Sequence, residues 1–255
     1  MQEALNDVDT RVAGVWEQIG QACTGAGRAR ESVRLLPVSK THPSQAMREV
    51  NAALDALALR DGLPTSAEHT RLFGENHVQE VVTKSEELAD AAGLGLALIG
   101  HLQSNKVNAV AGLVEEFQAL DTLKLAARLD RRLSALGRSL RVLVEVNTSG
   151  ESAKHGVPVD EALGLCRQLG DFDCLEVAGL MTVALNSPEP AAVGACFDRL
   201  RGLQARLRDD GVLGSSWSEL SMGMSGDFAL AIAHGATTVR IGTALFGPRD
   251  YDIAS

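Results

Sequence analysis

Short apolar runs alternate along the chain with longer stretches in which apolar residues recur every three or four positions. The short runs have the length and composition of buried strands, and the longer stretches have the periodicity of amphipathic helices. Eight candidate strands result, at 34–39, 71–74, 96–99, 116–120, 141–146, 175–180, 219–222 and 238–241. Candidate helices between them include 123–136, 159–169, 190–209 and 227–234.

Regular alternation of strand and helix predicts a parallel sheet, and eight units favour closure into a single (β/α)8 TIM barrel. An open doubly wound sheet would carry a Gly-rich fingerprint in its first turn. Here the first strand leads instead into Ser39-Lys40-Thr41-His42-Pro43. We expect one α/β domain spanning 1–255, with residues 1–33 forming a leading helix packed on the barrel.

Composition narrows the functional classes. The 255 residues match the size of one such barrel, and a net charge of -9 argues against binding to nucleic acid or an anionic membrane. The four cysteines show no metal-ligand spacing, which predicts free thiols in a reducing cytoplasm and no metal site. Residues 1–20 lack the pattern of a signal peptide, and no apolar stretch is long enough to span a bilayer. We therefore expect a soluble cytoplasmic protein.

Lys40 is the leading candidate for chemistry, because it follows the first apolar strand directly. A lysine at the mouth of an apolar barrel loses solvation, so its ammonium form is disfavoured and its amine becomes available. Such an amine can form an imine with an aldehyde. The alternative interpretation is a strand-end lysine whose ammonium group reaches out to water.

Polar and small residues follow the other strands as well. Chemistry in a (β/α)8 barrel gathers at the C-terminal ends of the strands, so these residues are expected on one rim. In chain order they include Asn76, His101, Asp121, Asn147, Met181, Thr182, Ser221, Ser225, Arg240, Gly242 and Thr243. Each alone is compatible with turn or helix-cap chemistry. Together they predict a polar-rimmed pocket around one lysine.

The segments after the last two strands predict a phosphate site. Residues 221–227 (Ser-Met-Gly-Met-Ser-Gly-Asp) and Gly242-Thr243 offer hydroxyls and backbone N–H groups where this barrel commonly binds phosphate. The alternative is that Ser225 is a plain helix cap and Gly242 a packing glycine. Because the barrel closes the eighth strand onto the first, the phosphate site would adjoin Lys40. An aldehyde and a phosphate on one small ligand describe pyridoxal 5′-phosphate (PLP).

Ordered motifs across the chain resemble the YggS/PROSC-type pyridoxal phosphate homeostasis proteins. They are residues 38–41 (Val-Ser-Lys-Thr), 73–76 (Phe-Gly-Glu-Asn), 78–80 (Val-Gln-Glu), 100–106 (Gly-His-Leu-Gln-Ser-Asn-Lys), 146–151 (Val-Asn-Thr-Ser-Gly-Glu), 179–182 (Gly-Leu-Met-Thr), 220–225 (Leu-Ser-Met-Gly-Met-Ser), 239–242 (Val-Arg-Ile-Gly) and 246–247 (Phe-Gly). The resemblance implies a barrel of the alanine-racemase N-terminal type that holds PLP as a covalent imine on Lys40.

The resemblance also implies a role for each matching position. Ser225, Gly242 and Thr243 would hold the phosphate, and Arg240 would face the pyridine nitrogen. The pocket would be lined by Asn76, Asn147, Met181 and Ser221, with His101 at its rim. The family binds and buffers the cofactor without an established turnover. We therefore expect a monomeric PLP carrier that can deliver PLP to apo-enzymes.

Two departures from the family pattern stand near the second strand. The 44–72 segment is longer than the usual spacing, with the extra residues around 57–68 expected to extend the helix and loop before that strand. His77 stands where an aromatic or basic residue is common. These departures affect the expected shape of the rim, and neither touches the lysine or phosphate motifs.

The main alternative function is a PLP-dependent racemase. Racemisation needs a base on each face of the substrate, and only Lys40 is in place, since the single tyrosine, Tyr251, follows the last strand. In addition, Arg240 beside the pyridine nitrogen would keep that nitrogen unprotonated and weaken the ring as an electron sink.

Two further alternatives share the barrel. A Schiff-base aldolase would need an acid near the imine, for which Glu75, Asp121 and Glu151 are the candidates. A non-catalytic scaffold for protein partners is the other.

Lys106 and Lys154 lie in polar loops after strands. Each could offer a second amine for transfer of the aldehyde, and the alternative interpretation is a solvated surface lysine.

Overall fold

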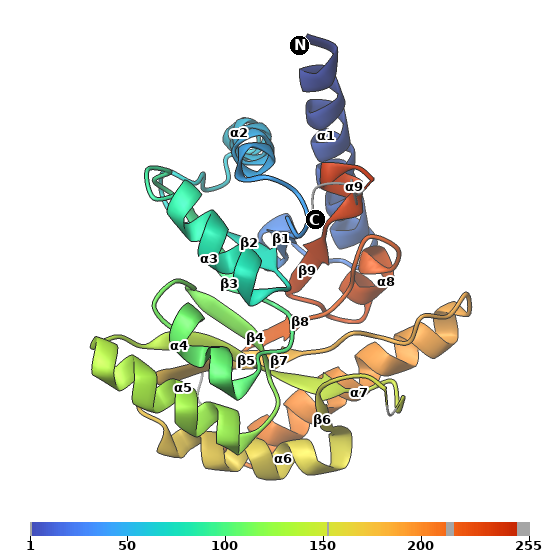
Figure 1. Ribbon diagram of the computed structural model, residues 1–255. Coiled ribbons are helices and arrows are strands. Elements are labelled where there is room, and N and C mark those ends of the chain that lie inside the picture. Colours follow the sequence, from blue (N-terminus) through green and yellow to red (C-terminus); the bar gives the residue numbers. More distant parts are fainter. Residues whose placement is uncertain (1, 152, 213–216, 249–255) are drawn as a thin grey trace.

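A computed structural model describes residues 2–151, 153–212 and 217–248. Eight parallel strands form a nearly closed barrel with helices around its outside (Figure 1). The barrel strands are β1 (Arg34–Pro37), β2 (Arg71–Glu75), β3 (Leu94–Leu98), β4 (Glu116–Leu120), β5 (Leu140–Asn147), β7 (Leu175–Met181), β8 (Glu219–Ser221) and β9 (Thr238–Ile241). All eight predicted strands are present within two residues of their expected ends, and the single (β/α)8 barrel is confirmed.

The seam between β1 and β2 is where the barrel is least completely joined. β1 pairs with β9 over four residues, whereas a single bridge, Val38 to Gly74, joins it to β2. The N–H of Val38 points to β9 and the N–H of Ser39 donates to the carbonyl of Gly74 at 3.1 Å, so alternate residues of β1 face β2. Pro37 is the preceding residue on the β2 side, and it has no N–H to donate. Pairing toward β2 therefore lacks a main-chain donor at Pro37.

One additional short strand was not predicted. β6 (Val157–Pro158) follows the loop after β5 and pairs with the end of that strand, with Val157 opposite Val146. Two residues give no periodicity from which a strand could be recognised.

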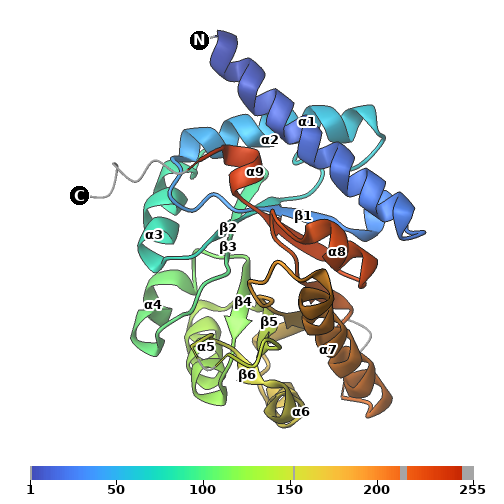
Figure 2. The same cartoon turned by 90° about the vertical axis from the view of Figure 1, so that its right-hand side faces the viewer.

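Helices cover the outside of the barrel, and α1 lies across α2, α8 and α9 (Figure 2). The helices are α1 (Gln2–Gly25), α2 (Ser44–Arg60), α3 (Val78–Glu87), α4 (Val107–Val110), α5 (Leu123–Leu136), α6 (Val159–Gln168), α7 (Pro190–Asp209), α8 (Phe228–Ala233) and α9 (Thr243–Phe246), with short 3-10 turns at Arg30–Ser32, Ser104–Lys106 and Leu169–Asp171.

The prediction of one leading helix over 1–33 is wrong at its C-terminal end. α1 ends at Gly25, and Gly27 follows with a φ of 66°, a left-handed conformation that glycine adopts without steric cost. The N–H of Arg28 then donates to the carbonyl of Cys23, which closes the end of the helix. The rest of the expectation holds, since α1 packs on the barrel helices.

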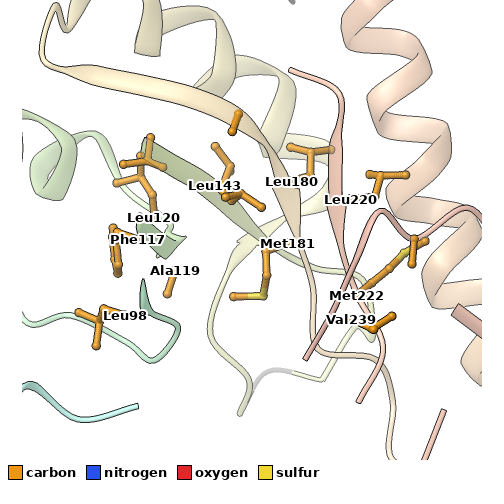
Figure 3. Close-up of a cluster of buried hydrophobic side chains, with 14 of the residues drawn as sticks. Leu98, Phe117, Ala119, Leu120, Leu143, Leu180, Met181, Leu220, Met222 and Val239 are labelled. Atoms are coloured by element: carbon orange, nitrogen blue, oxygen red, sulfur yellow. The ribbon is translucent and has the colours of Figure 1, made fainter. Parts of the chain in front are cut away.

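Apolar side chains from several strands form a buried cluster. Figure 3 shows part of this cluster, including Leu98, Phe117, Met181, Met222 and Val239, all buried. Within the described ranges, no helix combines the length and apolar character needed to cross a membrane. The long segment before β2 consists of α2 and a loop from Asp61 to Thr70, as expected.

Candidate cofactor site

A cavity of about 400 Å³ opens at the C-terminal ends of β1 and β9. Its volume lies in the range of small-molecule sites, roughly 300–1,000 Å³. It is lined by Val38, Lys40, Asn76, Ile99, Val183, Met224, Ser225, Gly226, Arg240, Gly242 and Thr243. Six of the ten predicted site residues are therefore brought together: Lys40, Asn76, Ser225, Arg240, Gly242 and Thr243.

Lys40 reaches the cavity because β1 ends just before it. Its side chain is half-buried, and the next residue, Thr41, turns the chain with a φ of 66°. The peptide groups on both sides of Lys40 are held by α3. Lys84 Nζ donates to the carbonyl of Ser39 at 2.8 Å, and the N–H of Thr41 donates to Glu80 Oε2 at 2.7 Å. The lysine therefore projects from a fixed backbone.

Arg240 is a buried cation on the β9 wall of the cavity. It is 4% exposed, donating from Nη1 to Ser221 Oγ at 2.9 Å and from Nη2 to the carbonyl of Thr182 at 2.8 Å. Burial lowers the pKa of Arg240 to about 10, against the opposing effects of Glu145 and Asp227. The guanidinium therefore remains charged at neutral pH and is fixed in direction by two acceptors.

The loops after β8 and β9 form the wall that could hold an anion. Ser225 and Gly226 contribute from one loop, and Gly242 and Thr243 from the other. A Cβ added at Gly242 would stand 3.1 Å from the carbonyl oxygen of Val38, so the loop after β9 packs closely against β1. In α9 the N–H groups of Leu245 and Phe246 already donate to the carbonyl of Gly242. The hydroxyls of Ser225 and Thr243 offer further donors to an anion.

Four predicted site residues lie outside this lining. Met181 is 1% exposed and belongs to the buried cluster of Figure 3, and Ser221 is fully buried beneath Arg240. Asn147 Oδ1 accepts from Ser149 and its amide donates to the Glu151 carbonyl, so this side chain stabilises its own loop. His101 stacks on His155 with 4.3 Å between ring centroids.

The candidate acids and additional lysines are also elsewhere. Glu75 is buried below Lys40, Asp121 lies 3.7 Å from His101 Nδ1, and Glu151 pairs with Lys154 at 2.6 Å. Lys154 Nζ also donates to the carbonyl of Ala184 at 2.8 Å. Lys106 is exposed in its 3-10 turn. None of these five side chains lines the cavity. Tyr251 lies outside the residues that the structure describes.

Sequence reasoning missed the apolar part of the lining. Val38, Ile99, Val183 and Met224 supply walls on which a flat ring could rest. One signal was available for Val38, because it precedes Lys40 by two residues and so points to the same side of the strand. The others lie at or just beyond strand ends, where the direction of a side chain depends on the turn.

A larger hollow of about 580 Å³ lies at the opposite end of the β1–β2 seam, below the point where Pro37 interrupts pairing. Leucine side chains and Trp16 line most of it, together with arginines. Two of these arginines are already engaged: Arg34 contacts Glu116 at 2.9 Å, and Arg71 contacts Asp55 at 2.8 Å. This hollow contains no lysine, so the candidate chemistry stays with the smaller cavity.

The fold and the site define the class of the protein, a barrel of the alanine-racemase type with a lysine after its first strand. Residues 30–250 match the family model described as alanine racemase, N-terminal domain, and the chain belongs to this family. The resemblance to the YggS/PROSC-type proteins is also confirmed. The chain is 40% identical over 247 residues to the pyridoxal phosphate homeostasis protein of Pseudomonas aeruginosa, covering 97% of this chain and 98% of that protein.

Solved structures agree with this placement. The PLP-bound structure of PipY from Synechococcus elongatus PCC7942 matches with a TM-score of 0.75 and 33% identity, over 94% of this chain and all of PipY (100%). An alanine racemase from Clostridium difficile shares the fold, with a TM-score of 0.65 and 13% identity. That match covers 95% of this chain and 57% of the racemase.

Proposed function

We propose that this protein binds PLP, holds it as an imine on Lys40, and buffers or delivers it. The observation that carries the proposal is one cavity lined by a strand-end lysine, a buried arginine and two Gly-containing loops. Relatives named as pyridoxal phosphate homeostasis proteins and the PLP-bound PipY structure support it.

The lining fits the groups of the cofactor. Lys40 would attack the aldehyde carbon, so that a C=N bond forms and water leaves. Ser225, Gly242 and Thr243 would bind the phosphate, and a Cβ at Gly242 would crowd the Val38 carbonyl oxygen at 3.1 Å. Arg240 would face the pyridine nitrogen and, being cationic at neutral pH, keep it unprotonated.

A carrier fits the cavity better than a racemase or an aldolase. Racemisation needs a second base opposite the lysine, and the aldolase reaction needs an acid near the imine. Among the described residues the lining holds no carboxylate, histidine or tyrosine that could serve. We accordingly propose a cytoplasmic, monomeric carrier with PLP-dependent apo-enzymes as acceptors.

The test is the absorption spectrum after incubation with PLP and desalting. The wild type should show an imine band that borohydride reduces, Lys40→Ala should show none, and Lys106→Ala should match the wild type. No band in the wild type would contradict the proposal. Sustained turnover of an amino acid by the purified protein, abolished in Lys40→Ala, would instead establish an enzyme.

A further inference from the structure

One face of α3 holds the backbone on both sides of Lys40. Lys84 Nζ donates to the Ser39 carbonyl at 2.8 Å, and Glu80 Oε2 accepts from the Thr41 N–H at 2.7 Å. Lys84 and Glu80 are four residues apart on the helix and contact each other at 3.3 Å. The two peptide groups that flank the lysine are thus fixed by one linked pair of side chains.

A buried carboxylate anchors this pair to the barrel. Glu75, at the end of β2, is fully buried and accepts from Lys84 Nζ at 2.6 Å and from Ser39 Oγ at 2.5 Å. Lys84 is itself only 5% exposed, and its three donors meet three acceptors: Ser39, Glu75 and Glu80. A buried ammonium is stable only with such complete pairing. The geometry of the cluster is therefore well defined.

The contacts from α3 matter because little main-chain pairing joins β1 to β2. Main-chain pairing between β1 and β2 is limited to the Val38–Gly74 bridge, and Pro37 has no N–H to donate toward β2. Thr41 moreover adopts a left-handed conformation, which is strained for a β-branched residue and persists only where the surroundings enforce it. Side chains from α3 supply the constraints that the ladder lacks.

We infer that Glu80 and Lys84 are positioning residues that direct the Lys40 amine into the cavity, an inference that rests on the proposed imine function. α3 begins two residues after Asn76, which lines the same cavity, so helix and cavity wall are parts of one continuous segment. A near-attack geometry depends on such support, since a misplacement of about 1 Å can slow a reaction roughly 100-fold. The phosphate-binding loops belong to β8 and β9 and do not depend on this pair.

The expected signature separates positioning from general stability. Loss of either side chain should slow imine formation and leave the non-covalent binding of a PLP analogue unchanged. The analogue is pyridoxine 5′-phosphate, which carries the ring and phosphate but has no aldehyde. A residue that only stabilises the fold would affect both quantities or neither.

The experiment uses the full chain with Lys84→Met, Glu80→Met, the conservative Lys84→Arg, and Lys124→Met as a matched control on an exposed position of α5. Stopped-flow absorbance gives the rate constant of imine formation with PLP, and fluorescence titration gives the affinity for pyridoxine 5′-phosphate. We expect a fall on the order of 10- to 100-fold in the rate for Lys84→Met and Glu80→Met, because each removes a partner of the Lys40 backbone. The affinity of both variants for pyridoxine 5′-phosphate should stay within about twofold of the wild-type value. Lys84→Arg should form the imine faster than Lys84→Met, because it restores a cation at this position.

Each outcome decides one question. Unchanged rates in both variants, with an imine in the wild type, would overturn the inference and leave the proposed function standing. A parallel loss of rate and affinity would show a structural role and also overturn it. Absence of the imine in the wild type would overturn the proposed function together with the inference. If Lys84→Met does not fold, Glu80→Met answers alone, because it removes the acceptor of the Thr41 N–H and leaves Lys84 paired with Glu75.

Discussion

The guanidinium of Arg240 and the hydroxyl of Ser221 are joined by a hydrogen bond of 2.9 Å beneath the Lys40 cavity. Ser221 accepts from Arg240 and donates onward to Gln118 Oε1 at 2.7 Å, and Gln118 donates to Glu116 at 2.6 Å. Glu116 in turn pairs with Arg34 at the other end of the barrel. A continuous series of hydrogen-bonded side chains therefore crosses the barrel interior and fixes the direction of Arg240.

Ser221→Ala should lower the free energy of unfolding by about 1–3 kcal/mol, because it leaves Gln118 without its donor and Arg240 without an acceptor in a buried place. Urea denaturation measures the change. Ser134→Ala, on an exposed position of α5, is the control and should be nearly neutral. Equal free energies of unfolding for Ser221→Ala and Ser134→Ala would show that the hydrogen bonds of Ser221 contribute nothing to stability.

Gly242→Ala should weaken PLP binding about tenfold, which corresponds to roughly 1.4 kcal/mol. The new methyl group would stand 3.1 Å from the Val38 carbonyl and push the loop into the cavity. Gly202→Ala in α7 meets nothing within 4 Å and serves as the matched control, with unchanged binding and a slight gain in stability. Titration of each variant with PLP gives the affinities, and an unaffected Gly242→Ala would contradict the assignment of this loop.

Glu145 should make the protein less stable as pH rises. Burial raises its pKa from the ordinary 4.5 to about 7, reinforced by Asp121 and opposed by Arg240. Between these two pH values the folded state keeps a proton that the unfolded state has lost, so the free energy of unfolding falls with increasing pH and levels off above 7. Glu145→Gln should remove about 2 kcal/mol of this fall.

The measurement is a series of urea melts from pH 5 to 8 on the wild type and Glu145→Gln. Burial likewise raises the pKa of Glu75 to about 7, so a smaller fall in the same direction should persist in the variant. Parallel curves for the two proteins would show that Glu145 does not titrate in this range.

Thr41→Gly should raise the free energy of unfolding by about 1 kcal/mol, because glycine adopts a φ of 66° without the steric cost that threonine bears. Thermal melts would show the gain as a higher Tm. Thr24→Gly, within helix α1, should do the opposite by about 0.5–1 kcal/mol. A destabilised Thr41→Gly would mean that contacts of the threonine side chain outweigh the backbone cost.

The strands and the lysine were predictable because each rests on a local signal. β4 (Glu116–Leu120) and α5 (Leu123–Leu136) have the predicted bounds, since apolar runs and helical periodicity mark both clearly. Lys40 and Gly242 come together because the first and last strands of a barrel are neighbours. That relation follows from topology and needs no side-chain detail.

The direction of individual side chains could not be predicted in the same way. Ser221 and Met181 are the last residues of β8 and β7, and they point into the packed interior, where a shift of one residue would have reversed them. Glu80 and Lys84 look like an ordinary charged pair on a solvated helix face. Only the fold shows that this face lies against Ser39 and Thr41, with Lys84 buried and Glu80 partly exposed.

The pairing of β1 with β9 has a consequence for synthesis of the protein. Lys40 emerges from the ribosome about 200 residues before Arg240 and Thr243, yet the cavity exists only where these residues meet. A nascent chain therefore has no complete site until its last strand has been released and has docked beside its first. If the protein binds PLP as proposed, it can capture the cofactor only after translation and folding of the whole barrel are finished, and truncated chains lacking β9 should leave free PLP untouched.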